Sequence, residues 1–145
     1  MYKLLIVDDE DLIRKGIRVI IEKLGLSISR YFEAEDGLKA IDIALNSKPD
    51  IIITDIRMPY LSGLEFIKRL RQVDADVRII ILSGYNDFEY AREAIKIGVS
   101  DYLLKPVMQD ELKKVLNKTL SELREVPRSG YGTKPRRLLY NNLSD

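Results

Sequence analysis

The stretch IIITDIRMPYLSG, residues 51–63, joins an apolar run to a stiff loop at a single acidic residue. Residues 51–54 are all β-branched, which is typical of a strand that is buried on both faces. Pro59 fixes its own φ and disfavours helical geometry at Met58, so the residues after the strand are predicted to form a loop. Asp55 is therefore expected at the carboxyl end of a core strand, with a rigid loop behind it.

Four other apolar runs alternate with amphipathic segments along the chain. The other predicted strands span residues 3–7, 27–34, 77–84 and 101–106, and the predicted helices span residues 12–24, 36–46, 61–70, 86–98 and 112–123. This alternation predicts a parallel sheet with helices on both faces. Five units favour an α/β, flavodoxin-like (βα)5 three-layer sandwich with strand order 2-1-3-4-5 over a closed barrel, which needs eight units and about 250 residues.

The composition excludes several classes of chemistry. The 145 residues include no Cys and no His, which removes disulfides, thiol nucleophiles, histidine metal ligands and histidine-dependent triads. Covalent chemistry must therefore use Asp, Glu, Ser, Thr, Lys or Tyr. The net charge of +1 does not favour nucleic-acid binding by bulk electrostatics, and the apolar runs fall short of the roughly 20 residues of a membrane span. Because the N-terminus also lacks a signal-peptide pattern, a cytoplasmic protein is expected.

The chain divides into two segments of different pattern. Residues 1–124 carry all the predicted strands and helices and are expected to form one domain. Residues 125–145 contain two Pro, two Gly and several basic residues without a sustained period, which is typical of a linker or tail. That segment is too short for a folded DNA-binding module.

Polar residues stand at the carboxyl ends of four of the predicted strands. They are Asp8 and Asp9, Asp55, Ser83 and Lys105. In a parallel sheet these ends share one edge, and in the predicted order the first and third strands are neighbours, so three carboxylates meet there. A hard divalent cation such as Mg²⁺ relieves their repulsion, and with the nearby Lys it attracts a phosphoryl group. One carboxylate can then attack that group and form an acyl phosphate.

Each of these residues also has an ordinary structural interpretation. Asp8 or Asp9 can cap the first helix, and Ser83 can cap a later one. A lysine such as Lys105 is usually solvated, and Tyr102 suits a packing role. The functional interpretation is favoured because four separate strands deliver complementary groups to the same edge.

At this point the sequence resembles a response-regulator receiver domain, the phosphoacceptor part of bacterial two-component signalling. The resemblance covers residues 1–123 and rests on the motifs LIVDDE, IIITDIRMPYLSG, IIILSGYNDFEYA and GVSDYLLKPV. The last two are similar to receivers that precede an AraC-type helix-turn-helix output domain. Such a domain is not within this chain, so any DNA binding is expected to require it.

The resemblance implies a phosphoacceptor and a metal site. Asp55 corresponds to the phosphorylated residue. Asp9 is implied to ligate Mg²⁺ directly, assisted by Asp8, together with Asp55 and the backbone carbonyl of Arg57.

The resemblance also implies a set of residues that bind the phosphoryl group and respond to it. Lys105 is implied to pair with a phosphoryl oxygen, and Ser83 to donate a hydrogen bond to it, with Gly84 leaving room for the approach. Tyr102 is implied to rotate inward in step with Ser83. The Lys105–Pro106 peptide bond is expected to be cis.

The function implied is that of a regulatory phosphoacceptor rather than an enzyme. A sensor histidine kinase is the expected phosphoryl donor, and a phosphorylation-dependent homodimer is expected to form through residues 86–98, 101–106 and 112–123. Two alternatives remain. One is a haloacid-dehalogenase-like Mg²⁺ phosphatase that uses Asp9, although the residues after Asp11 depart from that pattern. The other is a pseudo-receiver that serves only as an interaction module.

Overall fold

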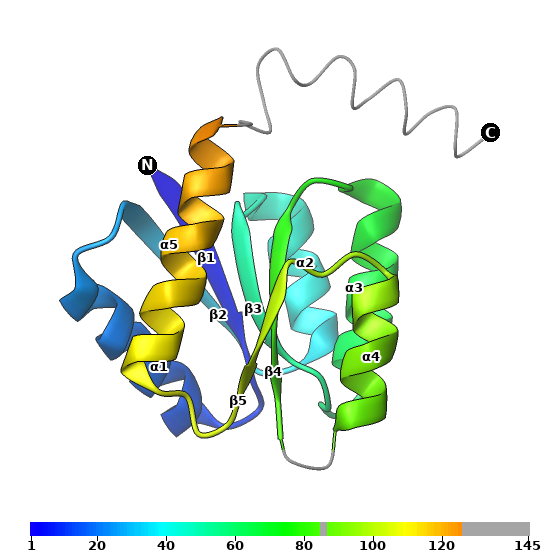
Figure 1. Cartoon of the computed structure of the whole chain (residues 1–145). Helices are drawn as coiled ribbons and strands as arrows, with labels where there is room; N and C mark the ends of the chain where they lie inside the picture. Colours follow the sequence, from blue (N-terminus) through cyan, green and yellow to red (C-terminus); the bar gives the residue numbers. More distant parts are fainter. Residues whose placement is uncertain (85–86, 126–145) are drawn as a thin grey trace.

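Strands and helices alternate along the chain (Figure 1). The structure, a computed structural model, describes residues 1–84 and 87–125, apart from the side chain of Phe88. The strands are β1 (Tyr2–Val7), β2 (Ile28–Ala34), β3 (Ile51–Asp55), β4 (Arg78–Ser83) and β5 (Asp101–Leu104). The helices are α1 (Asp11–Leu24), α2 (Gly37–Ser47), α3 (Gly63–Val73), α4 (Phe88–Lys96) and α5 (Gln109–Glu125).

The strands form one parallel sheet in the order β2-β1-β3-β4-β5. Val7 pairs with Thr54 and Asp55 pairs with Leu82, so β1, β3 and β4 end at the same edge. The predicted flavodoxin-like fold with strand order 2-1-3-4-5 is confirmed. The edge at which these strands end is where ligands bind in open α/β sheets.

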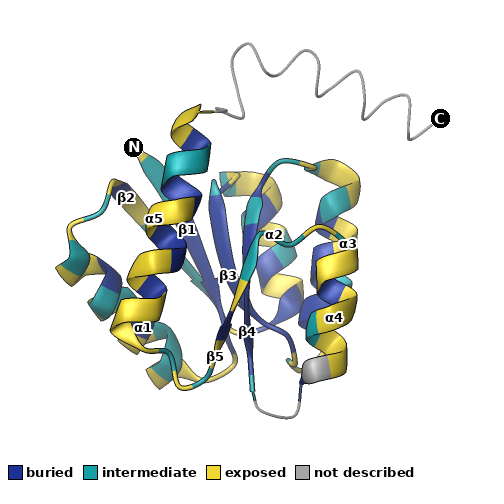
Figure 2. Ribbon diagram, viewed as in Figure 1, coloured by how far each residue is buried: buried dark blue, intermediate teal, exposed yellow. Residues whose placement is uncertain are grey.

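Strands β1, β3 and β4 are mostly buried (Figure 2), and their apolar side chains belong to two core clusters, one on each face of the sheet. Helices α1 and α5 lie over one face, and α2, α3 and α4 lie over the other (Figure 1). Within β3, Ile51 and Ile53 pack with α1 and α5, whereas Ile52 packs with α2 and α3. This two-sided burial explains why β3 is uniformly apolar rather than alternating.

The helix boundaries differ from the predicted ones by up to three residues at an end, and the start of α3 shows one reason. The helix predicted from residue 61 begins at Gly63, because the Ser62 hydroxyl caps it by accepting a hydrogen bond from the N–H of Glu65 at 3.1 Å. Leu61 instead packs as a buried loop residue. The helix predicted over 86–98 spans Phe88–Lys96 in α4, and residue 86 is outside the described residues. The predicted linker or tail also lies outside them from residue 126, so it stays a prediction.

Gly63 allows the loop after β3 to fold back on itself. Its N–H donates to the carbonyl of Ile56 at 3.0 Å, and a Cβ at Gly63 would collide with the carbonyl oxygen of Asp55 and lie 2.7 Å from the Ile56 Cα. The obstructing atoms are backbone atoms, so they cannot rotate away as a side chain would. The loop that follows Asp55 therefore requires glycine here.

We expect Gly63→Ala to lower the free energy of unfolding by about 3 kcal/mol, the upper part of the range for overpacking. A urea unfolding curve, monitored by circular dichroism, measures this change in the free energy of unfolding. The matched control is Gly16→Ala on the exposed side of α1, where a Cβ meets nothing within 4 Å. That change should raise stability by up to about 1 kcal/mol, the difference in helix propensity between Ala and Gly. Equal effects of the two substitutions would contradict the steric argument.

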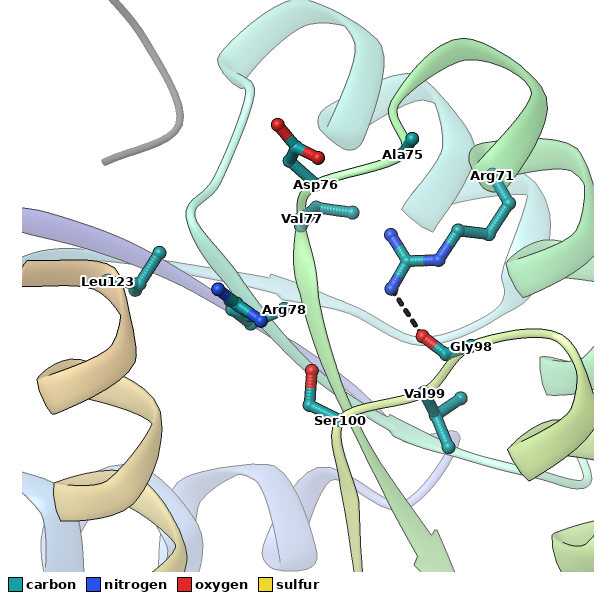
Figure 3. Close-up of a pocket in the computed structure, with 9 residues that line it drawn as sticks. All are labelled: Arg71, Ala75, Asp76, Val77, Arg78, Gly98, Val99, Ser100 and Leu123. Atoms are coloured by element: carbon teal, nitrogen blue, oxygen red, sulfur yellow. Dashed lines mark hydrogen bonds between the residues drawn. The ribbon is translucent and has the colours of Figure 1, made fainter. Parts of the chain in front are cut away.

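A hollow of about 250 Å³ lies at the amino-terminal end of β4, opposite the edge that carries Asp55 (Figure 3). Arg71, from the last turn of α3, donates one guanidinium hydrogen bond to the carbonyl of Gly98 at 2.8 Å and another to that of Asp74 at 3.2 Å. The guanidinium thus joins the end of α3 to the turn that follows α4. It anchors the carboxyl-terminal end of α4 to the α3 layer.

Candidate functional site

Three carboxylates lie together at the carboxyl ends of β1 and β3. One oxygen from each of Asp8, Asp9 and Asp55 lies within 4.8 Å of the others. Asp8 is fully buried, Asp55 is 5% exposed and Asp9 is exposed. Because β1 and β3 are hydrogen-bonded neighbours, the acids that the sequence placed at one edge do meet there.

Lys105 follows β5 and reaches two of these acids. Its Nζ donates a hydrogen bond to Oδ2 of Asp55 at 3.0 Å and lies 3.0 Å from Oδ2 of Asp8. Burial acts to lower the pKa of Lys105, but the carboxylates of Asp8 and Asp55 together outweigh it, so the pKa lies above its ordinary value. Lys105 is therefore held as a cation between two carboxylates.

The pKa of Asp55 is raised above its ordinary value of 3.8. Burial is the largest cause, because it disfavours the charged carboxylate, and the negative charge of Asp8 acts in the same direction. Lys105 and the backbone N–H of Arg57, which donates to Oδ1 at 3.3 Å, lower the pKa without offsetting these effects. Burial and the charge of Asp8 together therefore outweigh the effect of Lys105 on the Asp55 carboxylate.

The carboxylates fit a hard divalent cation. Oδ1 of Asp8 accepts a hydrogen bond from the backbone N–H of Glu10 at 2.8 Å. Oδ2 of Asp8 is buried and, although it lies in ion-pair contact with Lys105, accepts no aligned hydrogen bond from any described residue. A buried carboxylate oxygen in this state is available to a cation. Three carboxylates beside one ammonium group suit Mg²⁺, which prefers oxygen ligands.

The remaining predicted residues lie around this edge. Ser83 ends β4, is buried, and accepts a hydrogen bond on its carbonyl from the Lys105 N–H at 2.9 Å. Tyr102 on β5 is 49% exposed. The Lys105–Pro106 bond is cis, as the resemblance implied. The roles assigned to Ser83, Gly84 and Tyr102 in phosphoryl binding and switching, and the Arg57 carbonyl as a ligand, stay predictions.

Comparison with known proteins identifies the family. The response regulator receiver domain family matches residues 4–117. The chain belongs to the response regulator receiver domain family. The match spans most of the chain and includes all the residues of the acidic edge.

The receiver domain is similar to parts of longer transcriptional regulators. It is 42% identical over 124 residues to the transcriptional regulatory protein YesN of Bacillus subtilis (strain 168), covering 86% of this chain and 34% of that protein. It is 38% identical over 125 residues to the transcriptional regulatory protein HptR of Staphylococcus aureus (strain NCTC 8325), covering 86% of this chain and 49% of that protein. The chain thus spans about a third to a half of the length of these relatives.

Solved structures support the same assignment. The REC domain of AraT, a response regulator from Geobacillus stearothermophilus, aligns with a TM-score of 0.78 and 38% identity, covering 86% of this chain and 96% of that one. A two component transcriptional regulator AraC from Clostridium phytofermentans ISDg aligns with a TM-score of 0.76 and 34% identity, with the same coverage.

Two charged residues that sequence reasoning missed complete the surroundings of the receiver site. Arg14 on α1 is largely buried, donates to the backbone carbonyl of Asp8 at 2.6 Å and pairs with Glu33 of β2 at 3.0 Å. Asp87, just before α4, is buried and pairs with Arg57 at 3.2 Å. A buried charge in an amphipathic helix or loop gives no periodic signal, and the partners are distant in sequence, so only the fold reveals these pairs.

The raised pKa of Asp55 predicts a pH-dependent cost to stability in the absence of divalent cations. Below the ordinary pKa of 3.8 the carboxyl is protonated in both the folded and unfolded states. As the pH rises through the raised pKa of the folded state, the favourable contribution of the protonated form is lost. We expect the wild type to lose stability relative to Asp55→Asn as the pH rises from that ordinary value, and to level off above the raised pKa.

Urea unfolding in EDTA across this pH range measures the difference. Asp42→Asn removes an exposed carboxylate from α2 and serves as the control. A wild-type curve parallel to that of Asp55→Asn at every pH would contradict the prediction.

Proposed function

We propose that this receiver domain accepts a phosphoryl group on Asp55 from a phosphohistidine of a sensor histidine kinase, and that Asp8, Asp9, Asp55 and the backbone carbonyl of Arg57 hold Mg²⁺. The observation that carries this proposal is the position of Lys105, with Nζ 3.0 Å from both Asp8 and Asp55 in a cluster of three acids. The arrangement provides a nucleophilic carboxylate and a cation for the incoming group at the same place.

The chemistry of this chain is a carboxylate attack on phosphorus. An Asp55 oxygen forms the new P–O bond as the P–N bond to the donor imidazole breaks, and the imidazole nitrogen keeps the electron pair and takes up a proton. Lys105 pairs with a phosphoryl oxygen, and the Ser83 hydroxyl donates a hydrogen bond to another. Water later displaces the phosphoryl group as inorganic phosphate and restores the carboxylate. Mg²⁺, held by Asp8, Asp9, Asp55 and the backbone carbonyl of Arg57, would supply positive charge that offsets the negative charge of the transferred group.

The added charge is proposed to shift a conformational equilibrium. An acyl phosphate carries about −1.5 to −2 charges in place of the single negative charge of the Asp55 carboxylate, and this increase is proposed to bias two states of α4. The response is proposed to include an inward rotation of Tyr102. Half-exposed apolar side chains on and after β5, among them Tyr102, Leu104 and Met108, support a phosphorylation-dependent homodimer through α4, β5 and α5.

The output is proposed to be transcriptional and to lie outside this chain. The relatives named above are longer transcriptional regulators, and one similar structure is described as an AraC regulator, which supports an AraC-type helix-turn-helix output domain. Within the described part of the chain no helix has both the length and the apolar character to cross a membrane. We place the domain in the cytoplasm, where its phosphoryl donor would act.

The test is phosphorylation by a small-molecule donor. Intact-mass spectrometry of the wild type after incubation with acetyl phosphate and Mg²⁺ should show one phosphoryl group, and EDTA should prevent its addition. Addition that is independent of Mg²⁺ would contradict the proposed metal site. A protein that takes up no phosphoryl group and is not stabilised by Mg²⁺ would instead be a pseudo-receiver.

A further inference from the structure

Asp87 is a buried acid that the proposed chemistry does not use. It lies in the position before α4 and is 6% exposed. Its side chain makes no capping hydrogen bond to α4. Instead Oδ2 accepts a hydrogen bond from the backbone N–H of Gly84 at 2.8 Å. The carboxylate is therefore directed back toward the end of β4, where Ser83 lies.

The second oxygen of Asp87 faces the loop that follows Asp55. Oδ1 lies 3.2 Å from Nε of Arg57, whose guanidinium lies 5.0 Å from the ring centroid of Tyr90 in the first turn of α4. The backbone N–H of Arg57 in turn donates to Oδ1 of Asp55 at 3.3 Å. Asp87 thus connects the loop that follows Asp55 with the backbone that follows Ser83.

The contact between Asp87 and Gly84 is close. A Cβ at Gly84 would lie 3.3 Å from Oδ2 of Asp87, tighter than most real Cβ contacts. The Arg57 side chain is 58% exposed, and a pair with one exposed partner contributes little to stability. A buried acid that spans two functional loops at this distance is therefore better explained by positioning than by stability.

We propose that Asp87 is a positioning residue for phosphoryl transfer. It holds the Ser83–Gly84 backbone beside Asp55 and, through Arg57 and Tyr90, ties that backbone to the amino-terminal end of α4. This inference rests on the proposed function of Asp55. Arg71 anchors the other end of α4 through the carbonyl of Gly98 (Figure 3). Phosphorylation of Asp55 would therefore displace α4 mainly at the amino-terminal end, which Asp87 holds.

The experiment compares phosphorylation rates with acetyl phosphate at saturating Mg²⁺. Asp87→Ala should be phosphorylated about 10- to 100-fold more slowly, the scale of a small misplacement of a reacting group. Asp87→Asn keeps an oxygen acceptor for the Gly84 N–H and should be intermediate, and it also covers the case in which the alanine variant fails to fold. Glu89→Ala removes an exposed acid from the first turn of α4 and should match the wild type.

Two further measurements separate positioning from a general loss of structure. The dissociation constant for Mg²⁺ should stay within about twofold in the Asp87 variants, because Asp87 is not among the acids of the proposed metal site. The ¹H–¹⁵N signal of Gly84 should shift in Asp87→Ala and less in Asp87→Asn, because this amide loses its carboxylate acceptor.

Three results would contradict a positioning role for Asp87. Wild-type rates in both Asp87 variants would do so, as would a rate loss that is matched by an equal loss of Mg²⁺ affinity. The double variant Arg57→Ala/Asp87→Ala should be phosphorylated no more slowly than Asp87→Ala alone. A double variant whose rate loss equals the product of the two single losses would show that the two residues act independently. A wild type that takes up no phosphoryl group overturns the proposed function itself, and this is seen before any variant is compared.

Discussion

Asp55→Asn is expected to abolish phosphorylation by acetyl phosphate, while the wild type takes up one phosphoryl group. The amide is nearly isosteric but has no anionic oxygen to attack phosphorus. It also preserves the hydrogen-bonding shape of a side chain that is 5% exposed, so the fold should persist. Intact-mass spectrometry after incubation with Mg²⁺ and acetyl phosphate measures the result directly.

Asp9→Asn distinguishes the receiver function from the phosphatase alternative. In the receiver, loss of Asp9 weakens Mg²⁺ binding and slows labelling, but any phosphoryl group still resides on Asp55. In the phosphatase, Asp9 itself is the nucleophile, so Asp9→Asn would lose the label and Asp55→Asn would keep it. Asp11→Asn is the control, because Asp11 is exposed and is not among the acids of the proposed metal site. A label retained in Asp55→Asn would contradict the proposed function.

The fold and the acidic edge could be predicted because local patterns determine them. The β-branched run Ile51–Thr54 requires burial on both faces, and a strand buried on both faces indicates a parallel sheet covered by helices. Once the sheet is parallel, every residue that ends a strand lies at one edge, and the order 2-1-3-4-5 makes β1 and β3 neighbours. Asp8, Asp9 and Asp55 were thus brought together by topology alone.

The features that could not be predicted depend on side chains that are distant in sequence or on competing local signals. Leu61 fits the helical period of α3, but the Ser62 hydroxyl caps the helix and leaves Leu61 in the preceding loop. The ion pair between Arg57 and Asp87 joins loops from two different strands. No periodicity relates those two residues, and each alone resembles an ordinary solvated charge.

Lys105→Met is expected to slow phosphorylation about 100-fold or more, within the range for removing one group that stabilises transferred charge. Met preserves the length and apolar stem of the side chain but removes the cation 3.0 Å from Asp8 and Asp55. The rate with acetyl phosphate at saturating Mg²⁺ measures this effect. A rate equal to that of the wild type would exclude Lys105 from phosphoryl binding.

The same substitution should also lower the free energy of unfolding without Mg²⁺ by about 2 kcal/mol, less than for a fully buried pair because the Lys105 side chain is 22% exposed. Loss of Lys105 leaves the carboxylates without the cation that they contact, whereas loss of the Asp55 charge removes the cost of burying that carboxylate and its repulsion from Asp8. The two variants should therefore change stability in opposite directions in EDTA, and Mg²⁺ should restore much of the stability of Lys105→Met. Lys118→Met, which breaks an exposed pair with Asp101, is the control and should change stability little. If the stability of both the Asp55 and the Lys105 variant fell, burial of the Asp55 carboxylate and its repulsion from Asp8 would not outweigh its ion pair with Lys105.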